Sequence, residues 1–223
     1  MSIRAWIISD SHSKERMLKV PYGIEMVIHA GDAGTYKSPT MNANGVLDFL
    51  SWYRSLDVPH KIFVAGNHDG SIEAGLISKN EFEGIHYLQH EAKTIAGLKF
   101  FGSPYSPSFN NWAFNVARHK LGEYWKEIPD DTDILITHGP PAGVLDLTIN
   151  EDGHPFQCGC KSLWNRIKEI GTIKHHVFGH IHPESGCPNA GILKINGLHT
   201  TFINACVVNL QYNIENNGFV IDI

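Results

Sequence analysis

This chain of 223 residues lacks several common signatures. Its four cysteines are too few for a disulfide framework. It has no apolar run of about 18 residues or more, so we predict no membrane-spanning segment. Its first segment turns polar after Ile8, which is too short for the apolar core of a signal peptide. These absences lead us to expect a cytoplasmic protein with no membrane partner.

Positive charge is also scarce. Lys and Arg number 18 against 23 Asp and Glu, a formal charge of −5, and no stretch is rich in Lys or Arg. Proteins that hold long nucleic acids by neutralising phosphates are normally basic, so we expect no such partner. We find no internal repeat, no low-complexity linker and no break in composition. A single domain over residues 1–223 is therefore predicted; the sequence leaves its oligomeric state open.

Histidine, by contrast, is abundant, with 14 residues. Many of them fall in polar clusters that follow short apolar, β-rich runs. Five runs have this arrangement: 5–8, 26–28, 62–65, 134–136 and 176–178. In α/β proteins, ligands bind at the carboxyl ends of the strands. Because each cluster follows a strand, we expect the five clusters to meet at one site.

Helical periodicity fills several of the gaps between these strands. It covers residues 46–56 and 160–170, where Gly171 is a natural stop, and more weakly residues 110–127. Residues 192–203 look like a hairpin around Asn196-Gly197, and residues 207–212 and 219–223 are further strand candidates. Strands that alternate with helices predict an α/β fold.

The clusters combine carboxylates, a carboxamide and imidazoles. The groups expected to meet are Asp10, His12, Asp32, Asn67, His68, His138, His180 and His182. Oxygen and nitrogen donors without thiolate suit first-row ions, and seven ligands are too many for one tetrahedral ion but fit two ions that share a carboxylate. On an extended segment, residues two apart point the same way, which predicts that Asp10 and His12 grip one ion together. The same argument applies to His180 and His182.

The order of these motifs resembles the calcineurin-like metallophosphoesterase superfamily: D-x-H at 10–12, G-D at 31–32, G-N-H-D at 66–69, H-G at 138–139 and G-H-I-H at 179–182. Segments 102–104, 134–141, 159–160, 176–182 and 202–205 are similar to the metallophosphoesterase-domain-containing (MPPED) family of cyclic nucleotide phosphodiesterases. The resemblance extends over nearly the whole chain. It implies a four-layer α/β/β/α sandwich with a dinuclear metal site.

The resemblance also implies a role for each site residue. The first ion would be held by Asp10, His12, Asp32 and His182. Asp32 would bridge to a second ion, which would also be held by Asn67, His138 and His180. Mn²⁺ is the expected metal, with Fe, Co, Ni or Zn²⁺ as alternatives. His68 would contact the phosphate, as would Asn67, and would be the general acid when a metal-bridging hydroxide attacks.

The implied substrate is a small phosphodiester, including 2′,3′- and 3′,5′-cyclic nucleotides. A phosphomonoesterase, possibly a protein phosphatase, is the main alternative. The resemblance implies that the protein phosphatases of the superfamily have an Arg soon after the G-D and G-N-H motifs. Here Asp32 is followed by Ala-Gly-Thr and His68 by Asp-Gly-Ser, so both arginines are missing. An arginine from elsewhere, Arg54 or Arg118, could still supply that clamp. A nuclease is disfavoured by the acidic charge, and a non-catalytic scaffold by the complete set of ligands.

Four features have open or secondary roles. His29 is expected to be a core histidine or to support the site without binding metal. Asp69 could orient His68 or cap the turn that follows it. The aromatic residues Tyr105, Phe109 and Trp112 could form a wall for a nucleobase, although packing against the next helix is favoured. The pair Cys158 and Cys160 lacks the second pair that a zinc site needs, and packing is the favoured role for Cys160.

Overall fold

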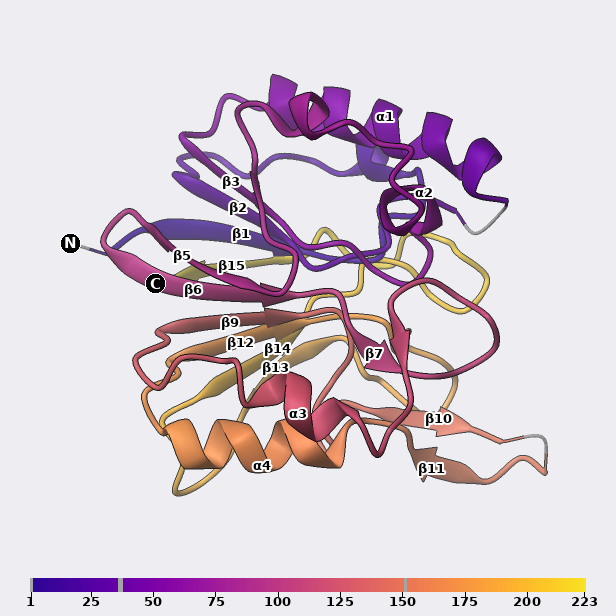
Figure 1. The fold of residues 1–223 in the computed structure, drawn as a ribbon, viewed down its shortest axis with the longest axis vertical. Coiled ribbons are helices and arrows are strands. Elements are labelled where there is room, and N and C mark those ends of the chain that lie inside the picture. The colour runs from indigo at the N-terminus through magenta and orange to yellow at the C-terminus, as the bar shows by residue number, and fades with distance from the viewer. Residues whose placement is uncertain (1, 36–37, 151) are drawn as a thin grey trace.

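Two β-sheets lie face to face in the middle of the molecule (Figure 1). The structure is a computed structural model that describes residues 2–35, 38–150 and 152–223. The first sheet has the strand order β15-β1-β2-β3-β4 and the second the order β13-β14-β12-β9-β6-β5. The strands of the first sheet are β1 (Arg4–Ile8), β2 (Met26–His29), β3 (His60–Phe63), β4 (His86–Tyr87) and β15 (Phe219–Asp222). Those of the second are β5 (Glu91–Ile95), β6 (Leu98–Ser103), β9 (Ile134–Thr137), β12 (His175–Phe178), β13 (Gly191–Lys194) and β14 (Thr201–Asn204).

Helices cover the two outer faces (Figure 1). The first sheet is covered by α1 (Pro39–Ser55) and α2 (Gly70–Glu73), and the second by α3 (Leu121–Trp125) and α4 (Lys161–Ile170). Two short 3-10 segments, η1 (Glu15–Met17) and η2 (Lys79–Phe82), complete the helical part of the described chain. The predicted four-layer α/β/β/α order is therefore confirmed. Within the described residues, no helix has both the length and the apolar character that crossing a bilayer requires.

The central strands of the two sheets are buried on both faces because each sheet is covered on both sides. In β1, Ala5 and Ile7 face the layer between the sheets, whereas Trp6 and Ile8 face α1. In β9, Ile134 and Ile136 face the layer between the sheets, whereas Leu135 packs toward α3 and α4. This alternation explains why short continuous apolar runs, rather than polar and apolar residues in turn, identified the strands.

All five strands predicted to precede polar clusters are present. The helix predicted over 160–170 is α4, and Gly171 ends it in the left-handed region with φ 68°. The helix predicted over 46–56 is the second half of α1, which begins with Pro39 at its first turn.

Two local predictions are wrong, and a third is right except for where its second strand begins. Residues 110–127 are helical only in α3, because Asn110 (φ 53°) and Phe114 (φ 54°) adopt left-handed conformations that interrupt a helix. The hairpin predicted around Asn196-Gly197 is present, since β13 pairs with β14 and the N–H of Leu198 donates to the carbonyl of Ile195 across the Asn-Gly turn, but β14 begins only at Thr201. Residues 207–212 form a loop with Tyr212 at φ 60°, whereas β15 forms in the last predicted segment.

Parallel pairing brings the strand ends together. β1, β2 and β3 are parallel neighbours, as are β6, β9, β12 and β14. Two small two-stranded sheets stand outside these layers: β7 (Ser106–Pro107) with β8 (Asn115–Val116), and the hairpin β10 (Leu147–Ile149) with β11 (Pro155–Gln157). Both lie at the right of Figure 1, toward which the carboxyl ends of β6 and β9 point.

Candidate metal centre and active site

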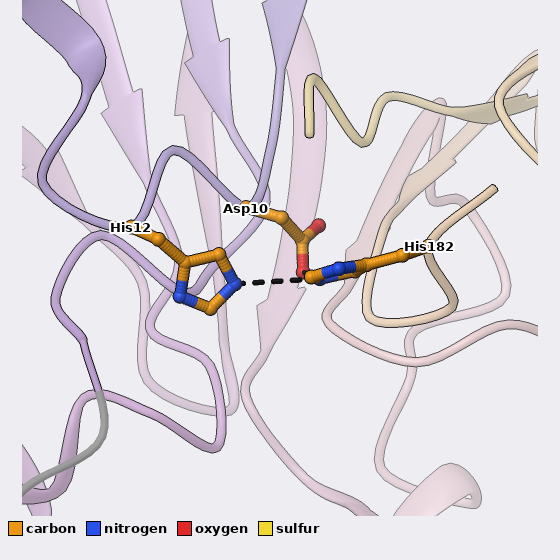
Figure 2. Close-up of side chains that lie close together, drawn as sticks. All are labelled: Asp10, His12 and His182. Carbon is orange, nitrogen blue, oxygen red and sulfur yellow. Dashed lines mark hydrogen bonds and ion pairs between the residues drawn. The ribbon is translucent and has the colours of Figure 1, made fainter. Parts of the chain in front are cut away.

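The loop after β1 and the loop after β12 bring together Asp10, His12 and His182, shown in Figure 2. Nε2 of His182 lies 3.3 Å from Oδ1 of Asp10 and 3.3 Å from Nε2 of His12. All three side chains are buried. Burial favours the neutral carboxyl of Asp10, but the hydrogen bond and the charge of His182 outweigh it and lower the pKa of Asp10.

Backbone carbonyls fix the orientation of the histidine rings. Nδ1 of His12 lies 3.2 Å from the carbonyl of Gly34, and Nδ1 of His182 lies 3.1 Å from that of Asn209. A carbonyl only accepts, so each ring donates its Nδ1–H and, when neutral, turns the lone pair of Nε2 toward the other ring. Two facing lone pairs repel each other unless a cation lies between them. This donor arrangement fits a metal ion.

Asp32, in the loop after β2, lies between this group and a second one. Its Oδ2 is 3.8 Å from Nε2 of His12, and its Oδ1 is 3.4 Å from Nε2 of His138. Asp32, His138 and His180 form a further set of close potential ligands, and Asp32 also groups with His12 and His68. One carboxylate therefore faces both groups, which is the position that a bridging ligand needs.

Asp32 and His138 each stabilise the charged form of the other. Burial favours the neutral form of each, but the neighbouring histidines lower the pKa of Asp32 and the Asp32 carboxylate raises the pKa of His138 to about 9. His138 donates its Nδ1–H to the carbonyl of Ala30 at 3.0 Å. Its Nε2 is directed at the carboxylate and at Oδ1 of Asn67, 2.7 Å away.

Asn67 has, in its side-chain amide, one buried atom that the described part of the protein does not satisfy. Its amide is buried, and Nδ2 has no hydrogen-bond partner within the described residues. A buried amide that the protein does not satisfy costs free energy and calls for an explanation. Nδ2 is a donor and calls for an acceptor, such as a phosphate oxygen, whereas Oδ1, 2.7 Å from Nε2 of His138, is the atom that could bind a second cation.

The backbone at the site is unusual. Four of the predicted ligands have positive φ: Asp10 (55°), His12 (44°), Asp32 (58°) and His180 (68°). Each such residue costs on the order of 1 kcal/mol and is held in place by the surrounding fold. Asp10 and His12 do meet, but not because they lie on an extended segment, so the reason given from their spacing is wrong.

Glycines in the motifs make room for the clustered side chains. A Cβ on Gly31 would meet the His138 ring, one on Gly66 would meet the Asp32 carboxylate, and one on Gly179 would meet the Asp10 carboxylate. The glycines of the G-D, G-N-H and G-H motifs are therefore required by close packing of loops from both sheets.

Asp69 has neither of the two roles considered from the sequence. Its carboxylate accepts hydrogen bonds from the backbone N–H groups of Asp32 (3.0 Å), Ala33 (3.3 Å), Gly34 (2.9 Å) and Gly66 (2.7 Å). It makes no side-chain cap to α2. Asp69 instead ties the loop after β2 to the loop after β3. No local sequence pattern indicates this role.

His68 lies between the predicted metal ligands, called the charged cluster below, and a cavity. Its backbone N–H donates to Oδ1 of Asp32 at 2.7 Å, and its carbonyl accepts from Nδ2 of Asn42 at 2.7 Å. Its ring centroid is 4.8 Å from that of His12 and 4.8 Å from that of Trp112. The side chain is thus fixed between the predicted ligands and an aromatic residue.

His29 is buried beside the cluster but does not join it. It lies among the rings of Phe49, Tyr53 and Phe63, its Nε2 is 3.1 Å from Oγ of Ser11, and burial lowers its pKa to about 3. This agrees with the expectation of a core histidine. Cys160 is likewise buried in the apolar layer under α4, as expected.

A cavity of about 590 Å³ opens onto the cluster. Its inner end is lined by Asp32, Asn67, His68, His180 and His182, and its wall includes Phe109, Trp112, Phe156 and Tyr212. Packing was favoured for the 105–112 aromatics; it is right for Tyr105, which packs against the core, and wrong for Phe109 and Trp112. Phe156 and Tyr212 also line the cavity, and no motif in the sequence marks them.

Of the two arginines considered, Arg118 lines the cavity and Arg54 does not. The guanidinium of Arg118 donates to the carbonyls of Gly159 (3.0 Å) and Cys158 (2.6 Å). Arg54 instead donates to the carbonyls of Glu81 and Glu83, outside the cavity.

Comparisons with known proteins agree with this geometry. A model of the calcineurin-like phosphoesterase family matches residues 3–184. The chain is 34% identical over 241 residues to human Metallophosphoesterase domain-containing protein 1, covering 97% of this chain and 69% of that one. One solved crystal structure, 14% identical, has a TM-score of 0.64 over 100% of this chain and 98% of its own.

A second solved structure is the putative 5′-nucleotidase from Staphylococcus aureus, also 14% identical. Its TM-score is 0.53, over 92% of this chain and 48% of that one. At these identities the two structures support the fold alone. Because the family model matches most of the chain and a relative is 34% identical over nearly all of it, this protein belongs to the calcineurin-like phosphoesterase family of hydrolases.

Proposed function

We propose that this protein is a phosphodiesterase that hydrolyses small phosphodiesters and depends on two divalent metal ions. The observation that carries the proposal is the position of Asp32, whose two oxygens face two groups of potential ligands beside one cavity. Oxygen and nitrogen donors without thiolate suit Mn²⁺, with Fe, Co, Ni or Zn²⁺ as alternatives.

In this proposal, one ion is held by Asp10, His12, Asp32 and His182, and the other by Asp32, Asn67, His138 and His180. The carbonyl-anchored Nδ1 atoms of His12, His138 and His182 support it, because they leave Nε2 to bind. When bound, the pair would activate water and neutralise charge on the phosphoryl oxygens.

His68 is the proposed general acid. It lies at the inner end of the cavity, next to Asp32 and Asn67, where the phosphate of a substrate would rest. A leaving alkoxide needs a proton, and an imidazole can donate one near neutral pH. Fixed between His12 and Trp112, the ring needs little reorganisation to remain directed at the leaving oxygen.

A diester is the proposed substrate because the site motifs offer little positive charge from arginine. The loop beyond Asp32 continues with Ala33 and Gly34, whose N–H groups are used by Asp69. A phosphomonoester dianion gains most from a bidentate arginine, whereas a diester has one negative charge. A cavity of about 590 Å³ is large enough for a nucleotide-sized ligand, so we propose 2′,3′- or 3′,5′-cyclic nucleotides, acted on in the cytoplasm.

One observation favours a second candidate, a phosphomonoesterase. Arg118 lines the same cavity, and its guanidinium is held by the carbonyls of Cys158 and Gly159. If it reaches the phosphate, it would supply the clamp that the motifs lack.

Initial rates on bis-(p-nitrophenyl) phosphate and p-nitrophenyl phosphate with added Mn²⁺, with and without chelator, test the proposal. We expect chelator-sensitive turnover that favours the diester. A preference for the monoester, abolished in Arg118→Ala, would establish the second candidate instead. Failure to hydrolyse either compound, or cyclic nucleotides, with two ions bound would overturn both.

A further inference from the structure

A row of aromatic rings leads from the charged cluster to the mouth of the cavity. The His68 ring contacts that of Trp112 at 4.8 Å, and Trp112 contacts Phe109 at 5.5 Å in an edge-to-face arrangement. Phe109 is 62% exposed although it lines the cavity. A ligand that covers an exposed aromatic ring removes apolar surface from water, and this burial favours binding.

The other side of the wall comes from the β10–β11 hairpin. Phe156, in β11, is 46% exposed and lines the same cavity, as does Ile149 in β10. Among the residues that the structure describes, these two strands pair only with each other. Phe156 thus faces the cavity from an element that belongs to neither large sheet.

Polar bonds fix this hairpin relative to the cluster. Asn189 donates to the carbonyls of Leu147 and His182, at 2.6 and 3.1 Å, and Oε1 of Glu184 accepts from Thr148 and Ile149, each at 3.1 Å. The segment that contains His182 therefore also positions the hairpin. A wall held in this way can recognise a flat group at a set distance from the phosphate.

We propose that Phe109, Trp112 and Phe156 form a subsite for the planar base of a nucleotide. The inference rests on the proposed function in that the phosphate is placed at His68, Asn67 and Asp32. The aromatic wall begins at Trp112, whose ring is next to that of His68. In a nucleotide the base is likewise separated from the phosphate by a ribose. Flat π-faces stack on aromatic side chains, whereas an aliphatic ester would not need three rings from two separate segments.

The test compares two ligands that differ only in the base. Isothermal titration calorimetry on the full chain loaded with Mn²⁺ would measure the binding of 5′-AMP and of ribose 5-phosphate. We expect 5′-AMP to bind about tenfold more tightly, the ratio that about 1.4 kcal/mol of stacking gives. Phe156→Ala and Phe109→Ala should each reduce this ratio severalfold, and Phe156→Tyr should preserve it.

Tyr22→Ala is the matched control, because Tyr22 is an aromatic residue that is 97% exposed and does not line the cavity. Circular dichroism checks the fold of each variant. Equal affinity for the two ligands in the parent, or equal losses for both in Phe156→Ala and Phe109→Ala, would overturn the base subsite. A base preference without diester hydrolysis would instead leave the subsite standing and reject the proposed phosphodiesterase.

Discussion

At the scale of single residues, the chemistry of each histidine depends on what its second nitrogen contacts. His12, His138 and His182 donate Nδ1–H to backbone carbonyls, whereas His29 uses both nitrogens within the protein. The motifs predicted which side chains would meet, and the structure brings all eight together. The sequence separated His29 from the ligands, but it could not predict which carbonyls orient the ligand rings, because those carbonyls are distant in sequence.

Replacing His68 separates the roles of acid and ligand. If His68 is the general acid, His68→Asn should lower kcat by about 10²–10⁴-fold, the usual contribution of proton transfer, and leave two ions bound. Steady-state rates and metal analysis of the same preparations measure both. His119→Asn, an exposed histidine outside the cavity lining, is the control. Loss of one ion together with activity would make His68 a ligand, as its position near His12 and Asp32 allows.

The buried imidazole of His29 makes stability depend on pH. Burial lowers its folded-state pKa to about 3, from 6.5, so the unfolded chain binds an additional proton between those values. Its contribution is therefore complete above pH 6.5 and declines as the pH falls, by up to about 1.4 kcal/mol per pH unit. We expect His29→Phe, which suits the surrounding rings, to give a shallower decline. Urea unfolding with chelator at pH 7.5, 6.0 and 5.0 measures the free energy of unfolding of both proteins. The same decline with pH in His29→Phe as in the parent would contradict the prediction.

At the scale of elements, strands were predictable and the loops between them were not. Buried strands and α4 have local apolar patterns, and these identified them. The hairpin β10–β11 and the loop that presents Tyr212 are held by bonds from side chains far away in the sequence. Asn189 and Glu184 hold the hairpin, and Nζ of Lys14 donates to the carbonyl of Tyr212. Such bonds exist only once the fold has formed.

Asp69 should be needed for the loops that present Asp32 and Asn67. In Asp69→Asn, one carboxylate oxygen becomes an NH₂ group that cannot accept from a backbone N–H, at a cost of about 1–3 kcal/mol. We expect lower stability in urea and a metal affinity reduced by about 10–100-fold, as when residues that orient ligands are changed. Asp57→Asn, at an exposed aspartate, should change neither. Unchanged metal affinity in Asp69→Asn would show that the loops hold without this carboxylate.

At the scale of the whole molecule, the candidate metal centre joins the two sheets. The loops after β1, β2 and β3 supply Asp10, His12, Asp32, Asn67 and His68, and the loops after β9 and β12 supply His138, His180 and His182. Periodicity predicted an α/β protein with one convergent site. The four-layer order came from the family resemblance alone, because no local pattern states which face of one sheet meets another.

Because ligands come from both sheets, bound metal should stabilise the packing of one sheet on the other. An ion that binds only the folded state adds about 2.7 kcal/mol per site at a concentration 100 times its Kd. For a chain of this size, each kcal/mol raises the midpoint of thermal unfolding by about 2–4 °C. Chelation should therefore lower the midpoint by about 5–10 °C if one site empties, and by more if both do.

Asp32→Asn distinguishes a shared ligand from two independent sites. Since Asp32 faces both groups, its loss should weaken both ions and remove most of the shift that chelator produces. Asp57→Asn should retain the full shift. Scanning calorimetry with Mn²⁺ or with chelator measures the midpoints, and metal analysis gives the stoichiometry. If Asp32→Asn kept two ions and the full chelator-dependent shift, Asp32 would not bridge them.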